Sequence, residues 1–145
     1  MKSRLKLTDK TDRSKRKGKR KPWPPGFRDK VFDGRCSADG KTRCRCCGRA
    51  LARNMKAALD HNLTADLADY VVCMQLCHII ARSLGGPDVF ENIWPGCEMC
   101  NLISRLRKFC DFAIEKGFEM TKTPEFIADH AAFQVWSAAQ GSIKM

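Results

Sequence analysis

The chain has 145 residues, with 27 Lys and Arg against 16 Asp and Glu, a formal net charge of +11, and 43% hydrophobic residues. This composition fits one folded domain and excludes a membrane-spanning protein, because no run approaches the roughly 18 apolar residues that a transmembrane helix needs. The excess of positive charge favours a polyanionic partner, most simply nucleic acid.

Most of the positive charge lies in residues 1–30, which hold 13 Lys and Arg against three acids. The densest part is the run 15–21. This composition predicts a basic disordered arm that grips phosphates, serves as a nuclear address or is only a solvated tail. The segment contains no apolar core of a secretory signal, so we expect an intracellular protein in the cytoplasm, nucleus or nucleoid, without membrane contact.

Residues 31–145 hold 14 basic and 13 acidic residues and predict one domain that mixes helices and strands. Apolar residues at helical spacing predict a helix over 49–59. The β-branched and apolar run 70–80 predicts a buried strand. The sequence Gly-Gly-Pro-Asp over 85–88 is a turn signal, and residues 92–95 are expected to be extended.

Two helices are expected after this turn. The first runs over 98–116 and ends at Gly117; its apolar stripe consists of Leu102, Ile103, Leu106, Phe109, Cys110 and Ala113. Thr123 caps the second, which ends at Gly141. Its apolar face could contact DNA, form a homodimer or complete the core, and consists of Phe126, Ile127, Phe133 and Trp136.

Nine cysteines in a chain expected in a reducing compartment indicate metal binding rather than disulfides. Four of them form two C-x2-C pairs about 50 residues apart, Cys44 with Cys47 and Cys97 with Cys100. Two such pairs predict one closed structural zinc site. Cys46 could replace either cysteine of the first pair, because the run over 44–47 allows more than one register.

The region 44–104 contains a histidine, His78, then a Gly-Gly turn, an asparagine, Asn92, and a C-x2-C pair followed by Asn101, in that order. With both cysteine pairs, this pattern resembles the HNH endonuclease family. The resemblance implies an α+β fold with a zinc-anchored ββα-metal (His-Me finger) core, preceded by the basic arm and followed by C-terminal helices over 105–145.

The resemblance also implies the chemistry. His78 would be the general base for hydrolysis of a DNA phosphodiester bond, and Asn92 would fix the imidazole. Asn101 would offer an oxygen to a catalytic Mg²⁺ or similar divalent ion, leaving 3′-hydroxyl and 5′-phosphate ends. The family often has a metal-binding Asp or His where this chain has Cys77, and a thiolate is poorly matched to Mg²⁺.

Positive charge gathers around the first cysteine pair. Residues 35–56 have a net charge of +6, whereas residues 57–104 have a net charge of −5. Arginines near the motif are candidates for phosphate contacts. They are Arg43, Arg45, Arg49, Arg82 and Arg105.

Three functions therefore remain open from the sequence. The first is a small free-standing HNH endonuclease that cuts DNA. The second is a non-catalytic, zinc-stabilised nucleic-acid-binding module on a decayed HNH scaffold, for which Cys77 is the best argument. The third is a zinc domain that binds proteins and uses the basic arm as an address.

Overall fold

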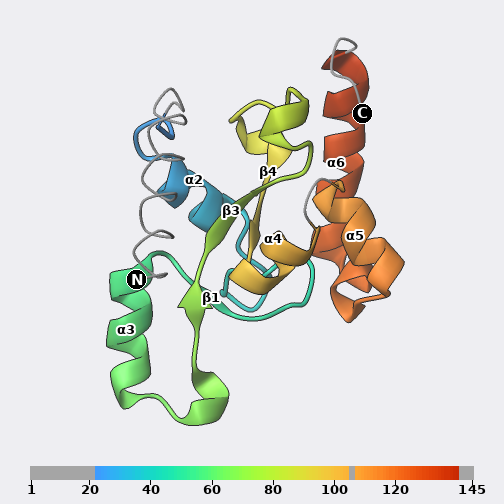
Figure 1. Cartoon of the computed structure of the whole chain (residues 1–145). Helices are drawn as coiled ribbons and strands as arrows, with labels where there is room; N and C mark the ends of the chain where they lie inside the picture. Colours follow the sequence, from blue (N-terminus) through green and yellow to red (C-terminus); the bar gives the residue numbers. More distant parts are fainter. Residues whose placement is uncertain (1–21, 105–106, 141–145) are drawn as a thin grey trace, which may run out of the picture.

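The computed structural model describes residues 22–104 and 107–140. It combines helices with two small two-stranded sheets, compatible with the predicted α+β class. The helices are α2 (Phe27–Gly34), α3 (Met55–Thr64), α4 (Glu98–Ser104), α5 (Phe109–Lys116) and α6 (Pro124–Gln140), and the strands are β1 (Leu51–Ala52), β2 (Val72–Cys73), β3 (Gln75–His78) and β4 (Ile93–Gly96) (Figure 1). Within these residues no helix is long and apolar enough to cross a membrane.

The two sheets share the segment predicted as one strand. Strand β2 pairs in parallel with β1, whereas β3 pairs antiparallel with β4, so that His78 lies opposite Ile93. The predicted strand 70–80 is therefore two short strands on either side of the buried residue Met74. His78 is the last residue of β3.

A helix follows the antiparallel hairpin directly. Strand β4 ends at Gly96, and α4 begins two residues later and packs against β3 (Figure 1). The chain order here is strand, strand, helix. Helix α3 lies apart from this unit and packs against β1 and β2.

The hydrophobic core joins the hairpin to the C-terminal helices. Trp94 of β4 is fully buried, and the ring of Phe126 meets it edge-on at 5.2 Å between centroids. Phe126 and Phe133 of α6 are buried, whereas Ile127 is 58% exposed. Of the three roles open to the apolar face of this helix, Phe126 and Phe133 serve in the core.

The helix expected over 49–59 begins later and extends further. Leu51 and Ala52 pair with β2 instead. The side chain of Asn54 accepts a hydrogen bond from the N–H of Ala57 (2.9 Å), which caps the helix so that α3 starts at Met55. Strand pairing and the cap therefore override the apolar spacing that suggested an earlier start.

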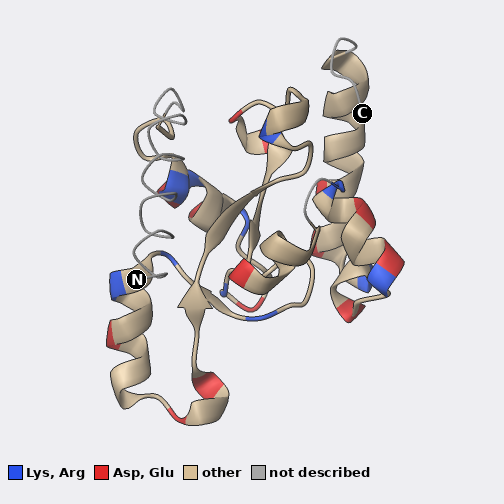
Figure 2. Cartoon of the chain, in the orientation of Figure 1, with Lys and Arg blue, Asp and Glu red and all other residues tan. Residues whose placement is uncertain are grey.

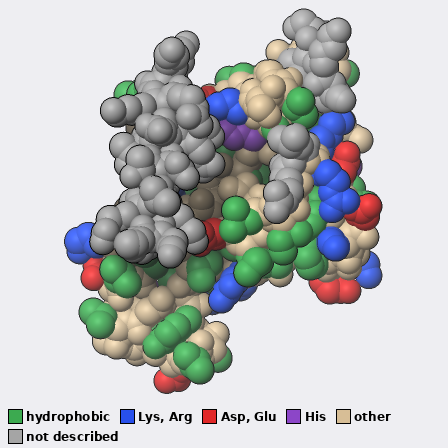
Figure 3. All heavy atoms as spheres, in the orientation of Figure 1, with side chains coloured by type: hydrophobic (Ala, Val, Ile, Leu, Met, Phe, Trp, Pro, Cys, Tyr) green, Lys and Arg blue, Asp and Glu red, His purple; other side chains and the backbone are tan. Residues whose placement is uncertain are grey.

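The helix expected over 98–116 is divided into α4 and α5. Leu102 and Ile103, predicted as core residues, are 61% and 50% exposed, and Figure 3 shows hydrophobic side chains gathered over this region. Leu106 lies outside the described residues. The remaining members of the predicted stripe are buried in α5: Phe109, Cys110 and Ala113.

The two predicted signals around the last connection are confirmed. Gly117 ends α5 in the left-handed region at φ 69°. The hydroxyl of Thr123 accepts a hydrogen bond from the N–H of Phe126 (3.2 Å) at the start of α6. Gly141, expected to end this helix, lies outside the described residues.

The boundary of the predicted arm also changes. Helix α2 begins at Phe27, inside the range 1–30 that the charge pattern marked as disordered, and Phe27 is buried in the core. Trp23 packs against the same core. The folded unit thus includes residues 22–30, and the remainder of the predicted arm, residues 1–21, lies outside the described residues.

Charged side chains of both signs cover the folded part. Figure 2 shows Lys and Arg interspersed with Asp and Glu on α2, α3 and α5. This distribution agrees with the balance of 14 basic and 13 acidic residues over 31–145.

Candidate functional site

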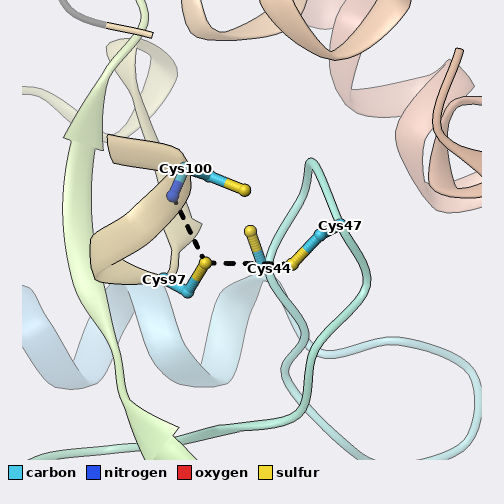
Figure 4. A group of neighbouring side chains, drawn as sticks. All are labelled: Cys44, Cys47, Cys97 and Cys100. Carbon is cyan, nitrogen blue, oxygen red and sulfur yellow. Dashed lines mark hydrogen bonds between the residues drawn. The ribbon is translucent and has the colours of Figure 1, made fainter. Parts of the chain in front are cut away.

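The four cysteines of the two C-x2-C pairs meet at the start of α4. Their Sγ atoms all lie within 4.8 Å of one another, and Figure 4 shows them pointing toward a common centre. Cys44 and Cys47 come from a loop, and Cys97 and Cys100 from the turn that begins α4. The predicted cysteine cluster is confirmed.

The spacing of the sulfurs fits a tetrahedral ion. Bonds of about 2.3 Å from zinc to sulfur separate the sulfur ligands by about 3.8 Å. The Sγ atoms of Cys47 and Cys97 lie 3.8 Å apart. The cluster could therefore hold a metal such as zinc, and such an ion would pin α4 to the loop over 44–47.

The thiols of the cluster shift one another's pKa values through hydrogen bonds. Hydrogen bonds from the thiols of Cys44 and Cys47 lower the pKa of Cys97. Hydrogen bonding to Cys44 and Cys97 raises the pKa of Cys47. Burial, and then the hydrogen bond with Cys97, raises the pKa of Cys100 to about 12. A cation among these sulfurs would favour their thiolate forms and displace the protons that they hold.

The register left open by the sequence is settled by Cys46. Its buried Sγ donates to the carbonyl oxygen of Phe109 (3.7 Å) and does not belong to the group of four. A second group of possible ligands, Cys110, Asp111 and His130, lies between α5 and α6. Burial raises the pKa of Cys110 to about 12, and this group offers three possible ligands where the cysteine cluster offers four.

Asn92 ties together the loop that follows His78. Its fully buried side chain accepts a hydrogen bond from the N–H of Ile80 (2.9 Å) and donates to the carbonyls of Ile80 (3.1 Å) and Pro87 (3.0 Å). Gly86 lies so close that a Cβ atom there would be 1.7 Å from the Ile80 oxygen. The Gly-Gly turn thus requires glycine for close packing, and Asn92 locks it.

His78 lies at the end of β3 with 16% of its side chain exposed. Its Nε2 lies 2.7 Å from Oδ1 of Asp88, and Oδ2 of Asp88 accepts a hydrogen bond from Arg82 at 2.7 Å. Burial opposes ionisation of Asp88, but hydrogen bonds from His78 and Arg82 outweigh it and hold the pKa of Asp88 below its ordinary value. The three side chains form one continuous polar chain.

An aromatic residue from outside the resemblance completes these surroundings. The indole of Trp23 stacks on the imidazole of His78, with centroids 5.3 Å apart and ring planes 28° apart. Trp23 also stacks on Phe27 at 5.4 Å, and the guanidinium of Arg82 lies 5.3 Å from the indole. The sequence prediction missed Trp23 because it lies within the basic range 1–30. The prolines and the glycine around it, over 22–26, are the signal of a rigid segment that could have found it.

The two predicted ligands of a catalytic ion differ in their surroundings. Asn101 lies inside α4 and therefore does not cap the start of this helix. Its side-chain amide forms no hydrogen bond within the described residues. Cys77 is fully buried, and its Sγ donates to the carbonyl of Gln75 (3.7 Å). Burial, and then the charges of Cys97 and Cys100, raises the pKa of Cys77 well above its ordinary value.

Cys77 is therefore not suited to a hard divalent ion. Its side chain is fully buried, and it lies outside the group of four cysteines. The mismatch between a thiolate and Mg²⁺ expected from the sequence therefore stays a prediction. Asn101 is left as the oxygen donor among the residues predicted to bind a catalytic ion.

The arginines predicted to contact phosphate differ in their exposure and in their ion pairs. Arg49 is exposed and forms no ion pair in the described parts of the chain. Arg43 is paired with Asp39 (2.7 Å), and Arg82 is paired with Asp88. Arg105 lies outside the described residues.

The structure contradicts the prediction that Arg45 contacts a DNA phosphate. The Arg45 side chain is buried and donates to Asp129 (2.8 Å) and to the carbonyl of Arg35 (2.9 Å). Arg35 is also buried and pairs with the other oxygen of Asp129 (3.1 Å). The two guanidiniums share the carboxylate of Asp129 and so connect α2, the cysteine loop and α6. Arg45 therefore has a structural role and cannot reach a phosphate.

Replacing Asp129 by asparagine is expected to destabilise the fold by about 3–5 kcal/mol, because it leaves two buried guanidiniums without a compensating charge. Chemical denaturation followed by circular dichroism measures this change. The matched control is Asp60→Asn, which breaks the exposed pair with Lys56 and should cost about 0.5 kcal/mol or less. Equal small losses for both variants would contradict the structural role of Asp129.

The chain was compared with family models, curated proteins and solved structures. No family model matches the chain, and neither a curated protein nor a solved structure does.

Proposed function

We propose that the chain is a small HNH-type endonuclease that hydrolyses DNA phosphodiester bonds on a zinc-anchored ββα-metal core over 44–104. The observation that carries this proposal is the placement of His78 at the end of a hairpin strand, beside a turn locked by Asn92. The helix with Asn101 follows the second strand, and the cysteine cluster fixes its start.

In this mechanism His78 is the general base. Asp88 accepts the Nε2–H of the neutral imidazole, which leaves the basic lone pair on Nδ1. Nδ1 takes a proton from water as the water oxygen forms a bond to phosphorus. The bond from phosphorus to O3′ breaks, and O3′ takes a proton from a second water, which gives 3′-hydroxyl and 5′-phosphate ends.

A divalent ion such as Mg²⁺, when bound, would stabilise the charge that develops on the phosphate. Asn101 is the residue of this chain that fits it, because its amide oxygen is a hard ligand and is not used in another hydrogen bond of the described residues. Phosphate and water would supply further ligands. Asp88 is already held by His78 and Arg82.

The substrate contacts follow from charge and exposure. Arg49 is an exposed cation two residues after Cys47, and we expect it to contact a phosphate. The basic run 15–21 ends two residues before Trp23 in the sequence, and Trp23 stacks on His78. We expect this run to contribute further contacts to DNA phosphates.

The test of the proposed function is scission of supercoiled plasmid by the full chain with Mg²⁺, Mn²⁺ or Ni²⁺. We expect nicked and then linear products that require an added divalent ion. End-group analysis should find 5′-phosphates. Intact plasmid with every ion, for protein whose zinc content and fold are verified, contradicts the proposal.

Cys77 favours one alternative, a non-catalytic nucleic-acid-binding module on the same scaffold. The family often has a metal ligand at this position, and here the thiol is buried, which raises its pKa. This alternative predicts DNA binding that weakens steeply with salt and no scission with any of the three ions.

Cys77→Ala tests whether Cys77 takes part in binding the catalytic ion. Since Cys77 is not suited to the catalytic ion, we expect this variant to retain metal-dependent cleavage within about threefold of the wild-type rate. The cleavage assay measures this rate directly. A loss of about 10–100-fold, as for removal of a metal-site residue, would show that Cys77 takes part in metal binding.

A further inference from the structure

The side chains around His78 restrict it from two directions. Asp88 meets the ring edge at Nε2, 2.7 Å away. Trp23 meets the ring face, with centroids 5.3 Å apart. An edge contact fixes which nitrogen carries the proton, and a face contact limits rotation of the ring.

Asp88 is itself held from two sides. Arg82 donates to its second oxygen at 2.7 Å, so the carboxylate has one oxygen for each partner. The residue before it, Pro87, has its carbonyl bonded by the buried amide of Asn92 (3.0 Å). Asn92 therefore fixes the backbone from which the carboxylate reaches His78, so its effect on the imidazole runs through Asp88.

Trp23 is held in the same way. Phe27 of α2 stacks parallel to the indole, with 4° between the ring planes. Arg82 lies 5.3 Å from the same indole, so one guanidinium contacts both Asp88 and Trp23. A residue from outside the motif region 44–104 thus belongs to the surroundings of the histidine.

We propose that Asp88 and Trp23 are positioning residues for His78: Asp88 holds the imidazole in the Nε2–H tautomer, and Trp23 holds the plane of the ring. This inference rests on the proposed function for its catalytic consequence. The arrangement itself can be measured without any cleavage.

The direct measurement is ¹⁵N NMR of the histidine rings in the full chain, at a pH at which the imidazole is neutral. The His78→Ala spectrum identifies the His78 signals among the three histidines. We expect the wild type to show the Nε2–H tautomer and Asp88→Asn to lose this preference. Trp23→Ala should keep the tautomer but lose the ring-current shift of the His78 ring protons, and Trp23→Phe should keep part of that shift.

Kinetics test the catalytic consequence. Asp88→Asn and Trp23→Ala should each lower kcat by about 10–100-fold and change KM by less than about threefold. Trp23→Phe should recover most of the loss, because a smaller aromatic ring still covers the imidazole. The control is Trp136→Ala on α6, which removes another half-buried tryptophan and should leave kcat and the His78 signals unchanged.

Two results overturn the inference. One is a wild-type His78 that carries its proton on Nδ1. The other is unchanged His78 signals in both Asp88→Asn and Trp23→Ala. If the chain cuts no DNA, the proposed function fails, but these spectra still decide whether Asp88 and Trp23 hold the imidazole.

Discussion

Replacing Cys97 by serine is expected to abolish metal binding and to unfold the domain. Cys97 is the sulfur on which the hydrogen bonds of the cluster converge, and the cluster joins the 44–47 loop to the start of α4. Apparent binding energies of structural zinc sites are about 10–16 kcal/mol, as large as the whole stability of many domains. Zinc content by mass spectrometry and thermal unfolding by circular dichroism measure the effect.

Cys46→Ala is the matched control for this prediction. It removes a buried cysteine from the same loop, but one whose Sγ contacts the Phe109 carbonyl rather than the cluster. We expect it to keep one zinc ion per chain and a cooperative unfolding transition. A Cys97→Ser protein with full zinc content and an unchanged transition would contradict the proposed zinc site.

Replacing His78 by alanine is expected to lower the cleavage rate by about 10²–10⁴-fold, the contribution typical of a general base. The chain offers no other histidine beside this turn, since His61 lies in α3 and His130 in α6. Single-turnover cleavage of a labelled DNA duplex measures the chemical step. Stability should change little, because His78 is the last residue of its strand and the buried Asn92 bonds hold the adjoining loop.

His61→Ala is the control for the loss of an imidazole. His61 is exposed and bonds the carbonyl of Asp69 at 2.9 Å, in a part of the chain separate from the hairpin. The His61→Ala variant should cleave DNA at the wild-type rate. Equal losses of activity in both variants would point to a general effect on the protein rather than to the base.

The sequence predicted the cysteine cluster because the spacing within each C-x2-C pair is a local signal. Two C-x2-C turns suffice to place two pairs of sulfurs, and the fold only has to bring the pairs together. The turn at Gly86 was predictable for a similar reason, since its Cβ-free backbone is a local requirement. Which of Cys44, Cys46 and Cys47 join the cluster depended on the backbone path and needed the structure.

Other features depend on distant partners and escaped the sequence. Arg45 looks like a DNA contact in a basic loop, but Asp129, 84 positions away, makes it part of the core. Trp23 was hidden by neighbouring cations, because charge density marks a segment as solvated and says nothing about one aromatic ring within it. Leu51 fits a helical pattern in the sequence, but in the structure it pairs with Val72 and belongs to a strand.

The most direct test of the central claim compares wild type and His78→Ala on the same supercoiled plasmid, at equal zinc content and with the same divalent ion. If His78 is the general base, the wild type shows metal-dependent scission and the rate of the variant is at least about 100-fold lower. Equal rates for the two proteins would contradict it.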